Sequence, residues 1–87
     1  MKTIIIFSKR AQKELEKLDR AVQTRIDVAV KEKLEKDSAK HLISLTGSLH
    51  GLYKFRVGDY RLICKKEEEK LVVLVVTIQH RGEVYKN

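Results

Sequence analysis

The stretch Tyr53-Lys-Phe-Arg-Val-Gly-Asp-Tyr-Arg-Leu-Ile-Cys-Lys65 decides the fold class, because it has the pattern of a β-hairpin. Apolar and cationic side chains alternate before Gly58-Asp59, which is the period of a half-buried strand. Glycine at the first central position of a two-residue loop favours a type II′ turn. We therefore predict one strand over residues 52–57 and a second strand over residues 60–66.

Two more strands are expected outside the hairpin. Residues 2–7 are rich in β-branched side chains, and the charged residues that follow argue against a signal peptide. Residues 71–78 are apolar almost throughout, which is typical of a central strand covered on both faces. Residues 38–51 predict a loop pinned by leucines, and residues 80–87 predict a tail or a single helical turn.

Residues 8–37 have helical periodicity. Ser8 is a good N-cap for a helix through Leu18, and Asp19 can cap a second helix that continues to about Asp37. The expected order is therefore β-α-α-β-β-β. This order predicts an α+β fold, with a mostly antiparallel sheet and an N-terminal helical hairpin packed on one face.

Length and composition narrow the classes of function. The 87 residues suit a single domain over 1–87. The single Cys cannot form an internal disulfide, and no Cys/His cluster has zinc spacing, so we expect no metal and no cofactor. No apolar run reaches the roughly 18 residues of a membrane helix, which predicts a cytoplasmic protein without a membrane partner. The net charge of +7 suggests a polyanionic partner such as nucleic acid.

The hairpin concentrates positive charge on one face. A two-residue turn places Arg56 opposite Arg61 and Lys54 opposite Ile63. Like charges directly across a pair of strands are destabilising. Two interpretations are open: a solvated face on which Arg stems cover apolar surface, or a site at which guanidinium groups hold phosphate in a bidentate manner.

A second polar cluster follows the apolar strand and contains His80, Arg81 and Tyr85. In a helical turn Arg81 and Tyr85 would be neighbours on one face, but a frayed terminus is also consistent with the sequence. If the strand continued straight through residue 80, His80 and Arg81 would point to opposite faces and only one could enter a site. A turn at Gln79 would free both.

Several parts of the chain together resemble the RelE/ParE toxin superfamily. The hairpin stretch resembles the central hairpin of that family, and Val76-Thr-Ile-Gln-His-Arg-Gly-Glu-Val-Tyr85 resembles its C-terminal motif. The resemblance implies the RelE-like microbial RNase fold and a toxin of a type II toxin–antitoxin system. RelE members are ribosome-dependent mRNA endonucleases that cut messenger in the A site, so the resemblance implies this metal-independent activity here.

The resemblance also implies site residues and partners. Carried over position by position, the active site of the family corresponds to Lys54, Arg56, Arg61, Arg81 and Tyr85. Arg56 and Arg61 would stabilise the phosphorane charge, Lys54 would hold a neighbouring phosphate, and Arg81 would be a further clamp. The implied partners are a RelB-like antitoxin, the ribosome with its mRNA, and operator DNA through the antitoxin complex alone.

The tail departs from the family pattern. One or two residues between Arg81 and Tyr85 are missing relative to RelE, and His80 stands where RelE has a Lys, while some relatives use a nearby His catalytically. The general base is therefore Tyr85 or His80. A Tyr needs its pKa lowered by nearby cations, at a cost of roughly 4 kcal/mol, whereas an ordinary His needs no such shift.

Two other functions remain open within the resemblance. A ParE-like protein would poison DNA gyrase by binding and would cut no RNA. A protein with the toxin fold could also have lost its activity and serve only as a binding partner. The five cationic and tyrosine positions favour the RelE-like function, because ParE members generally lack the full set.

Overall fold

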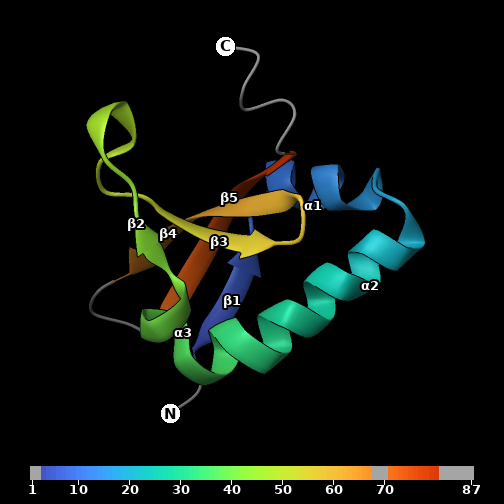
Figure 1. Cartoon of the computed structure of the whole chain (residues 1–87), viewed down its shortest axis with the longest axis horizontal. Coiled ribbons are helices and arrows are strands. Elements are labelled where there is room, and N and C mark those ends of the chain that lie inside the picture. The colour runs from blue at the N-terminus through green and yellow to red at the C-terminus, as the bar shows by residue number, and fades with distance from the viewer. Residues whose placement is uncertain (1–2, 68–70, 81–87) are drawn as a thin grey trace.

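The computed structural model of the protein describes residues 3–67 and 71–80. Figure 1 shows a curved sheet with helices packed against it. Along the described residues the elements follow in the order β1 (Ile4–Phe7), α1 (Lys9–Glu16), α2 (Arg20–Ala29), the π-helical segment η1 (Val30–Leu34), α3 (Glu35–His41), β2 (Ile43–Ser44), the short 3-10 helix η2 (Gly47–Leu49), β3 (Tyr53–Val57), β4 (Tyr60–Glu67) and β5 (Val72–His80).

The sheet has the strand order β1-β5-β4-β3-β2. Strand β1 pairs with β5 in parallel, whereas the other three pairings are antiparallel. The predicted α+β class is confirmed, and the sheet is mixed because of its one parallel edge. The parallel pairing places β1 beside β5, the last strand in the described part of the chain, although Phe7 and its partner Val75 are 68 positions apart.

The predicted hairpin is confirmed residue by residue. Arg56 pairs with Arg61, and Lys54 pairs with Ile63. Gly58 has a φ of 59°, while the described non-glycine residues, Asp59 included, have negative φ. A positive φ at the first central position alone is the requirement of the type II′ turn, so the glycine is needed at this point.

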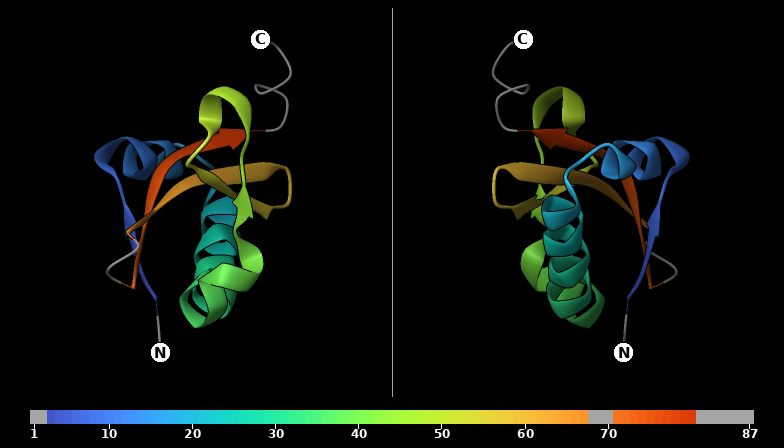
Figure 2. Two further views of the ribbon diagram at one scale, coloured as in Figure 1. Left: turned by 90° about the vertical axis from the view of Figure 1, so that its left-hand side faces the viewer. Right: turned by 90° about the vertical axis from the view of Figure 1, so that its right-hand side faces the viewer.

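One core joins the helices to a single face of the sheet. The face that carries Phe55 and Leu62 packs with helix residues such as Ile26 and Leu34, all of them almost fully buried. Figure 2 shows α2 and α3 lying against one side of the curved sheet, with α1 beside β5. The helical face of the sheet is therefore filled by apolar side chains.

Two predicted helix ends were wrong. Helix α1 ends at Glu16 rather than Leu18. Asp19 stands at the N-cap position of α2, as predicted, but its side chain makes no cap hydrogen bond to a described residue. The second helix does not stop at Asp37. The backbone kinks there, with φ −156° and ψ 79°, and continues in α3 to His41. The capping role of Ser8 is confirmed, since its Oγ accepts from the Ala11 N–H at 3.0 Å.

The segment 38–51, which was predicted to be a loop, contains a short strand. One face of β5 is less buried than predicted. Strand β2 has only two residues and pairs with β3, which is too short a pattern for periodicity to reveal. In β5, Val73 and Val75 are buried, but Val72 and Leu74 on the opposite face are only half-buried. No helix in the described part of the chain is long and apolar enough to cross a membrane.

Candidate functional site

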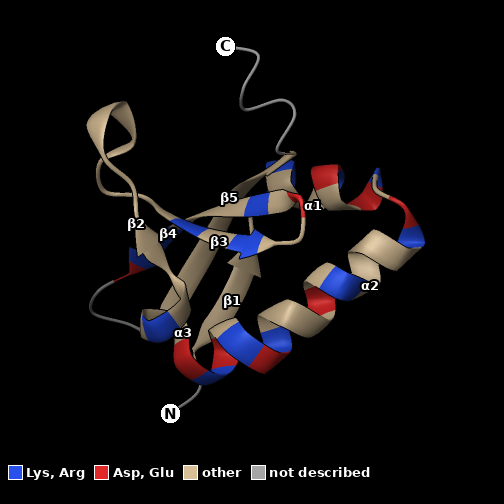
Figure 3. Cartoon of the chain, in the orientation of Figure 1, with Lys and Arg blue, Asp and Glu red and all other residues tan. Residues whose placement is uncertain are grey.

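Three basic side chains lie close together on the sheet face that points away from the core. They are Lys54 and Arg56 on β3 and Arg61 on β4, and we call them the cationic cluster. Lys65 of β4 lies on the same face, farther from the hairpin turn. Their strand neighbours Phe55 and Leu62 point into the core, so alternation sends the three cations to the other side. Figure 3 shows basic residues side by side on these two neighbouring strands. Arg56 is exposed, whereas Lys54 and Arg61 are half-buried.

The charge of the cationic cluster is not compensated within the described residues. The ion pairs found there join Arg10 to Glu14 and Lys36 to Glu32, and neither involves a member of the cluster. Two guanidinium groups and one ammonium group thus present free donors on one surface. Such a surface is built to bind a group that carries negative charge and several acceptor oxygens, and a phosphodiester has both properties.

Gln79 also belongs to this surface, and sequence reasoning did not single it out. It pairs with Arg61 across β4 and β5, so its half-buried amide lies on the face of the cationic cluster. The register depends on an irregularity in the strand pair between Ile63 and Cys64. A regular pairing inferred from the sequence would have placed Gln79 on the other face, which is why the pattern alone could not reveal it.

His80 lies on the opposite face from the cationic cluster. Strand β5 runs straight through residue 80, and His80 pairs with Tyr60, whose side chain points to the helix side. The two rings meet edge to face, with centroids 4.8 Å apart. The structure therefore brings Lys54, Arg56 and Arg61 together but does not bring His80 to them. Arg81 and Tyr85 lie outside the described residues.

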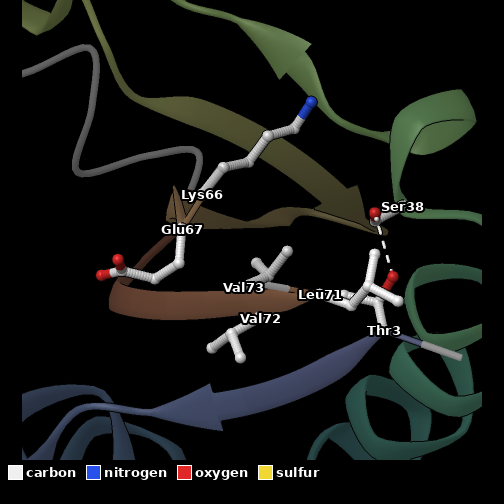
Figure 4. A pocket seen from close by; sticks show the side chains of 7 residues that line it. All are labelled: Thr3, Ser38, Lys66, Glu67, Leu71, Val72 and Val73. Carbon is white, nitrogen blue, oxygen red and sulfur yellow. Dashed lines mark hydrogen bonds between the residues drawn. The ribbon is translucent and has the colours of Figure 1, made fainter. Parts of the chain in front are cut away.

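Two hollows lie away from the cationic cluster. The first, of about 320 Å³, is lined by Glu14, Lys17, Leu18, Tyr60, Ile78 and His80 at the end of β5. The second, of about 210 Å³, is drawn in Figure 4 and is lined by Thr3, Ser38, Lys66, Glu67, Leu71, Val72 and Val73. Its walls are joined by a hydrogen bond of 3.2 Å between the hydroxyls of Thr3 and Ser38. Neither of these two hollows is lined by a member of the cluster.

The remaining reactive side chains do not form a second site. Burial raises the pKa of the Cys64 thiol to about 12, so this side chain stays protonated and behaves as a small core residue. Among residues 3–67 and 71–80, no three His, Cys, Asp or Glu side chains are grouped so that they could hold a metal ion.

Comparison with known proteins places this geometry in a family. Residues 5–85 match the family model described as the ParE toxin of the type II toxin–antitoxin system parDE. No curated protein sequence matches the chain significantly.

Solved structures of toxins and toxin–antitoxin complexes share the fold. The isolated RelE toxin of E. coli is 31% identical, with a TM-score of 0.70 and coverage of 95% of this chain and 90% of that one. The archaeal RelE–RelB complex from Pyrococcus horikoshii is 27% identical, with a TM-score of 0.71 and coverage of 94% and 98%. The RelBE2 toxin–antitoxin complex from Mycobacterium tuberculosis is 22% identical over 94% of both chains and has a TM-score of 0.86.

The family match spans nearly the whole chain, and the fold agrees with that of RelE toxins over the same length. The chain therefore belongs to the RelE/ParE superfamily and is the toxin of a type II toxin–antitoxin system.

Proposed function

We propose that the protein is a ribosome-dependent mRNA endonuclease that cleaves RNA without a metal ion. The observation that carries the proposal is the cationic cluster, in which Arg56 lies directly opposite Arg61 with Lys54 on the same face. This arrangement costs folding energy, because like charges oppose each other across two strands. A bound phosphodiester attracts both guanidinium groups and so offsets their mutual repulsion. This attraction supports a role in RNA binding over the interpretation of the cluster as a solvated face without a ligand.

The proposed reaction is attack of a ribose 2′-hydroxyl on the adjacent phosphate, which forms a 2′,3′-cyclic phosphate and breaks the bond from phosphorus to the 5′-oxygen of the next nucleotide. The 2′-hydroxyl gives up a proton, and the departing 5′-oxygen takes up one. Arg56 and Arg61 stabilise the additional negative charge of the phosphorane, because the two residues are held opposite each other on neighbouring strands. Lys54 holds the next phosphate along the RNA. In this proposal the sheet supplies electrostatic stabilisation, and the C-terminal segment supplies the group that transfers the proton.

Tyr85 is the proposed general base, and Arg81 is the proposed clamp on the leaving group. A cationic site favours the phenolate form of a tyrosine, so the positive charge proposed to bind phosphate would also prepare Tyr85 as the base. His80 lies beside Tyr60 on the face opposite the cationic cluster, and this position supports Tyr85 rather than His80 as the general base.

The proposed partners follow from this activity. A RelB-like antitoxin neutralises the toxin, and structures of relatives with RelB antitoxins support this partner. The ribosome and its mRNA supply the substrate in the cytoplasm, and operator DNA is contacted through the antitoxin complex. The net charge of +7 supports approach to a ribosomal RNA surface.

Primer extension on translated mRNA tests the proposal. Wild-type protein should give cuts at defined codon positions, and Arg61→Ala should abolish them. Arg20→Ala is the matched control, because it removes the same charge from an exposed position on α2. Intact mRNA with the wild-type protein would refute the proposal.

A second candidate function is gyrase poisoning, which the name of the matching family model favours. The same preparations should be added to DNA gyrase and supercoiled plasmid. Cleaved DNA complexes together with intact mRNA would establish this alternative.

A further inference from the structure

The last strand contains a β-bulge just before it reaches the cationic cluster. Cys64 of β4 pairs with Val75, whereas the preceding residue Ile63 pairs with Thr77. Val76 is therefore an extra residue in β5, and such residues bend a strand and re-aim the side chains that follow.

The bulge decides which side chain of β5 lies beside Arg61. With the extra residue, Gln79 pairs with Arg61 and Ile78 is buried in the core. Removing the one-residue shift would place Ile78 opposite Arg61 and would turn Gln79 toward the helices, because side chains alternate along a strand. The polar character of the surface next to Arg61 thus depends on the register after the bulge.

Helix α1 and its N-cap residue form hydrogen bonds to three consecutive residues that begin at the bulge. The Ser8 hydroxyl donates to the carbonyl of Val76 at 2.7 Å. The Glu14 carboxylate accepts from the Thr77 hydroxyl at 2.8 and 3.1 Å and from the Ile78 N–H at 2.9 Å. These contacts lie where β5 extends beyond the end of β1, so Glu14 satisfies donors that a neighbouring strand would otherwise bind.

We propose that Glu14 is a positioning residue for the RNA site, and that Gln79 is an additional RNA contact whose place Glu14 secures. The carboxylate fixes the register directly after the bulge, and the register aims the Gln79 amide at the surface of Arg61. An amide offers both donors and an acceptor, which suits a ribose hydroxyl next to a phosphate. This inference rests on the proposed function, because it assigns the surface to RNA.

The test uses the full chain and a single-stranded RNA with ribose at every position, without ribosomes, so that binding is measured without ribosome-dependent cleavage and the 2′-hydroxyls are present. Glu14→Ala removes the hydrogen bonds to the Thr77 hydroxyl and the Ile78 N–H. Glu14→Gln keeps an oxygen that accepts from the Ile78 N–H, and Glu16→Ala is the matched control, with the same charge change at an exposed position of α1. The readouts are the Kd for RNA, the exchange rate of the Ile78 amide, and the NMR contact between Arg61 and Gln79.

Glu14→Ala should weaken RNA binding about five- to tenfold, since a loosened supporting shell displaces the groups that it holds. It should also speed exchange of the Ile78 amide and weaken the contact between Arg61 and Gln79. Glu14→Gln should recover most of the affinity, and Glu16→Ala should match the wild type. Gln79→Ala should lower RNA affinity by a similar factor while leaving the exchange of the Ile78 amide unchanged.

If Glu14→Ala does not fold, Thr77→Val supplies a milder perturbation, because it removes one donor and keeps the Ile78 N–H. Wild-type RNA affinity and an intact contact between Arg61 and Gln79 in a folded Glu14 or Thr77 variant would overturn the inference. Equal RNA binding by the wild type and Arg61→Ala would instead refute the proposed function. In that case amide exchange and the NMR contact still report whether Glu14 sets the register.

Discussion

Replacing Arg56 with glutamine should make the protein more stable and a weaker RNA binder at the same time. Arg56 lies directly opposite Arg61, and neither forms an ion pair with a described residue. Opposed side chains begin about 5 Å apart at Cβ and splay apart at their tips. At a separation of about 7 Å in water, two unit charges repel by about 0.6 kcal/mol.

Removing this repulsion should raise the melting temperature of a domain of this size by about 2–5 °C. The gain should shrink in about 1 M salt, where the screening length is about 3 Å. Lys65→Gln is the matched control, because Lys65 is an exposed cation of β4 whose partner in β5 is Leu74 rather than another cation. Thermal unfolding followed by circular dichroism measures both variants.

RNA binding should change in the opposite direction. Loss of one charged hydrogen bond of about 1.5 kcal/mol lowers the affinity for single-stranded RNA roughly tenfold. The slope of log K against log salt should become less steep by about 0.7, the value for one phosphate contact on a single strand. A variant that is less stable than the wild type, or that binds RNA with the same affinity and salt slope, would refute the reasoning.

Two further predictions concern groups outside the cluster. Burial raises the pKa of Cys64 to about 12 from its ordinary value of 9.0, so the unfolded chain releases this proton first and stability should fall as pH rises from about 9 toward 12. The loss in the free energy of unfolding approaches about 1.4 kcal/mol per pH unit. Cys64→Ala should make this fall less steep when the free energy is measured by urea unfolding at high pH. Parallel curves of unfolding free energy against pH for the two proteins would contradict the prediction. Ser8→Ala removes both the cap of α1 and a hydrogen bond to Val76, and should cost about 1–2 kcal/mol in urea unfolding. A cost near zero would show that these hydrogen bonds are replaced by water.

The sequence was sufficient for the hairpin because its signals are local. Gly58 fixes the turn, the turn fixes the register, and the register places Arg56 opposite Arg61 without reference to the rest of the chain. The N-cap at Ser8 is local in the same way. These features needed only residues within a few positions of one another, and the structure confirms them.

The features that sequence analysis missed depend on long-range contacts. The parallel pairing of β1 with β5 and the bulge at Val76 depend on residues far apart in the chain. The hydrogen bonds of Glu14 to Thr77 and Ile78 span more than 60 positions, so no window of sequence contains both partners. This is why Gln79 was overlooked.

An NMR titration with single-stranded RNA tests the central claim most directly, since it asks whether the cationic cluster is the surface that binds RNA. The oligonucleotide has ribose at every position and is added to the labelled full chain at low salt without ribosomes, so that no ribosome-dependent cleavage takes place. Shifts should concentrate on Lys54, Arg56, Arg61 and Gln79, and should vanish with Arg56→Gln/Arg61→Gln. Shifts confined to the helix side, around Val28 and Tyr60, would contradict the account.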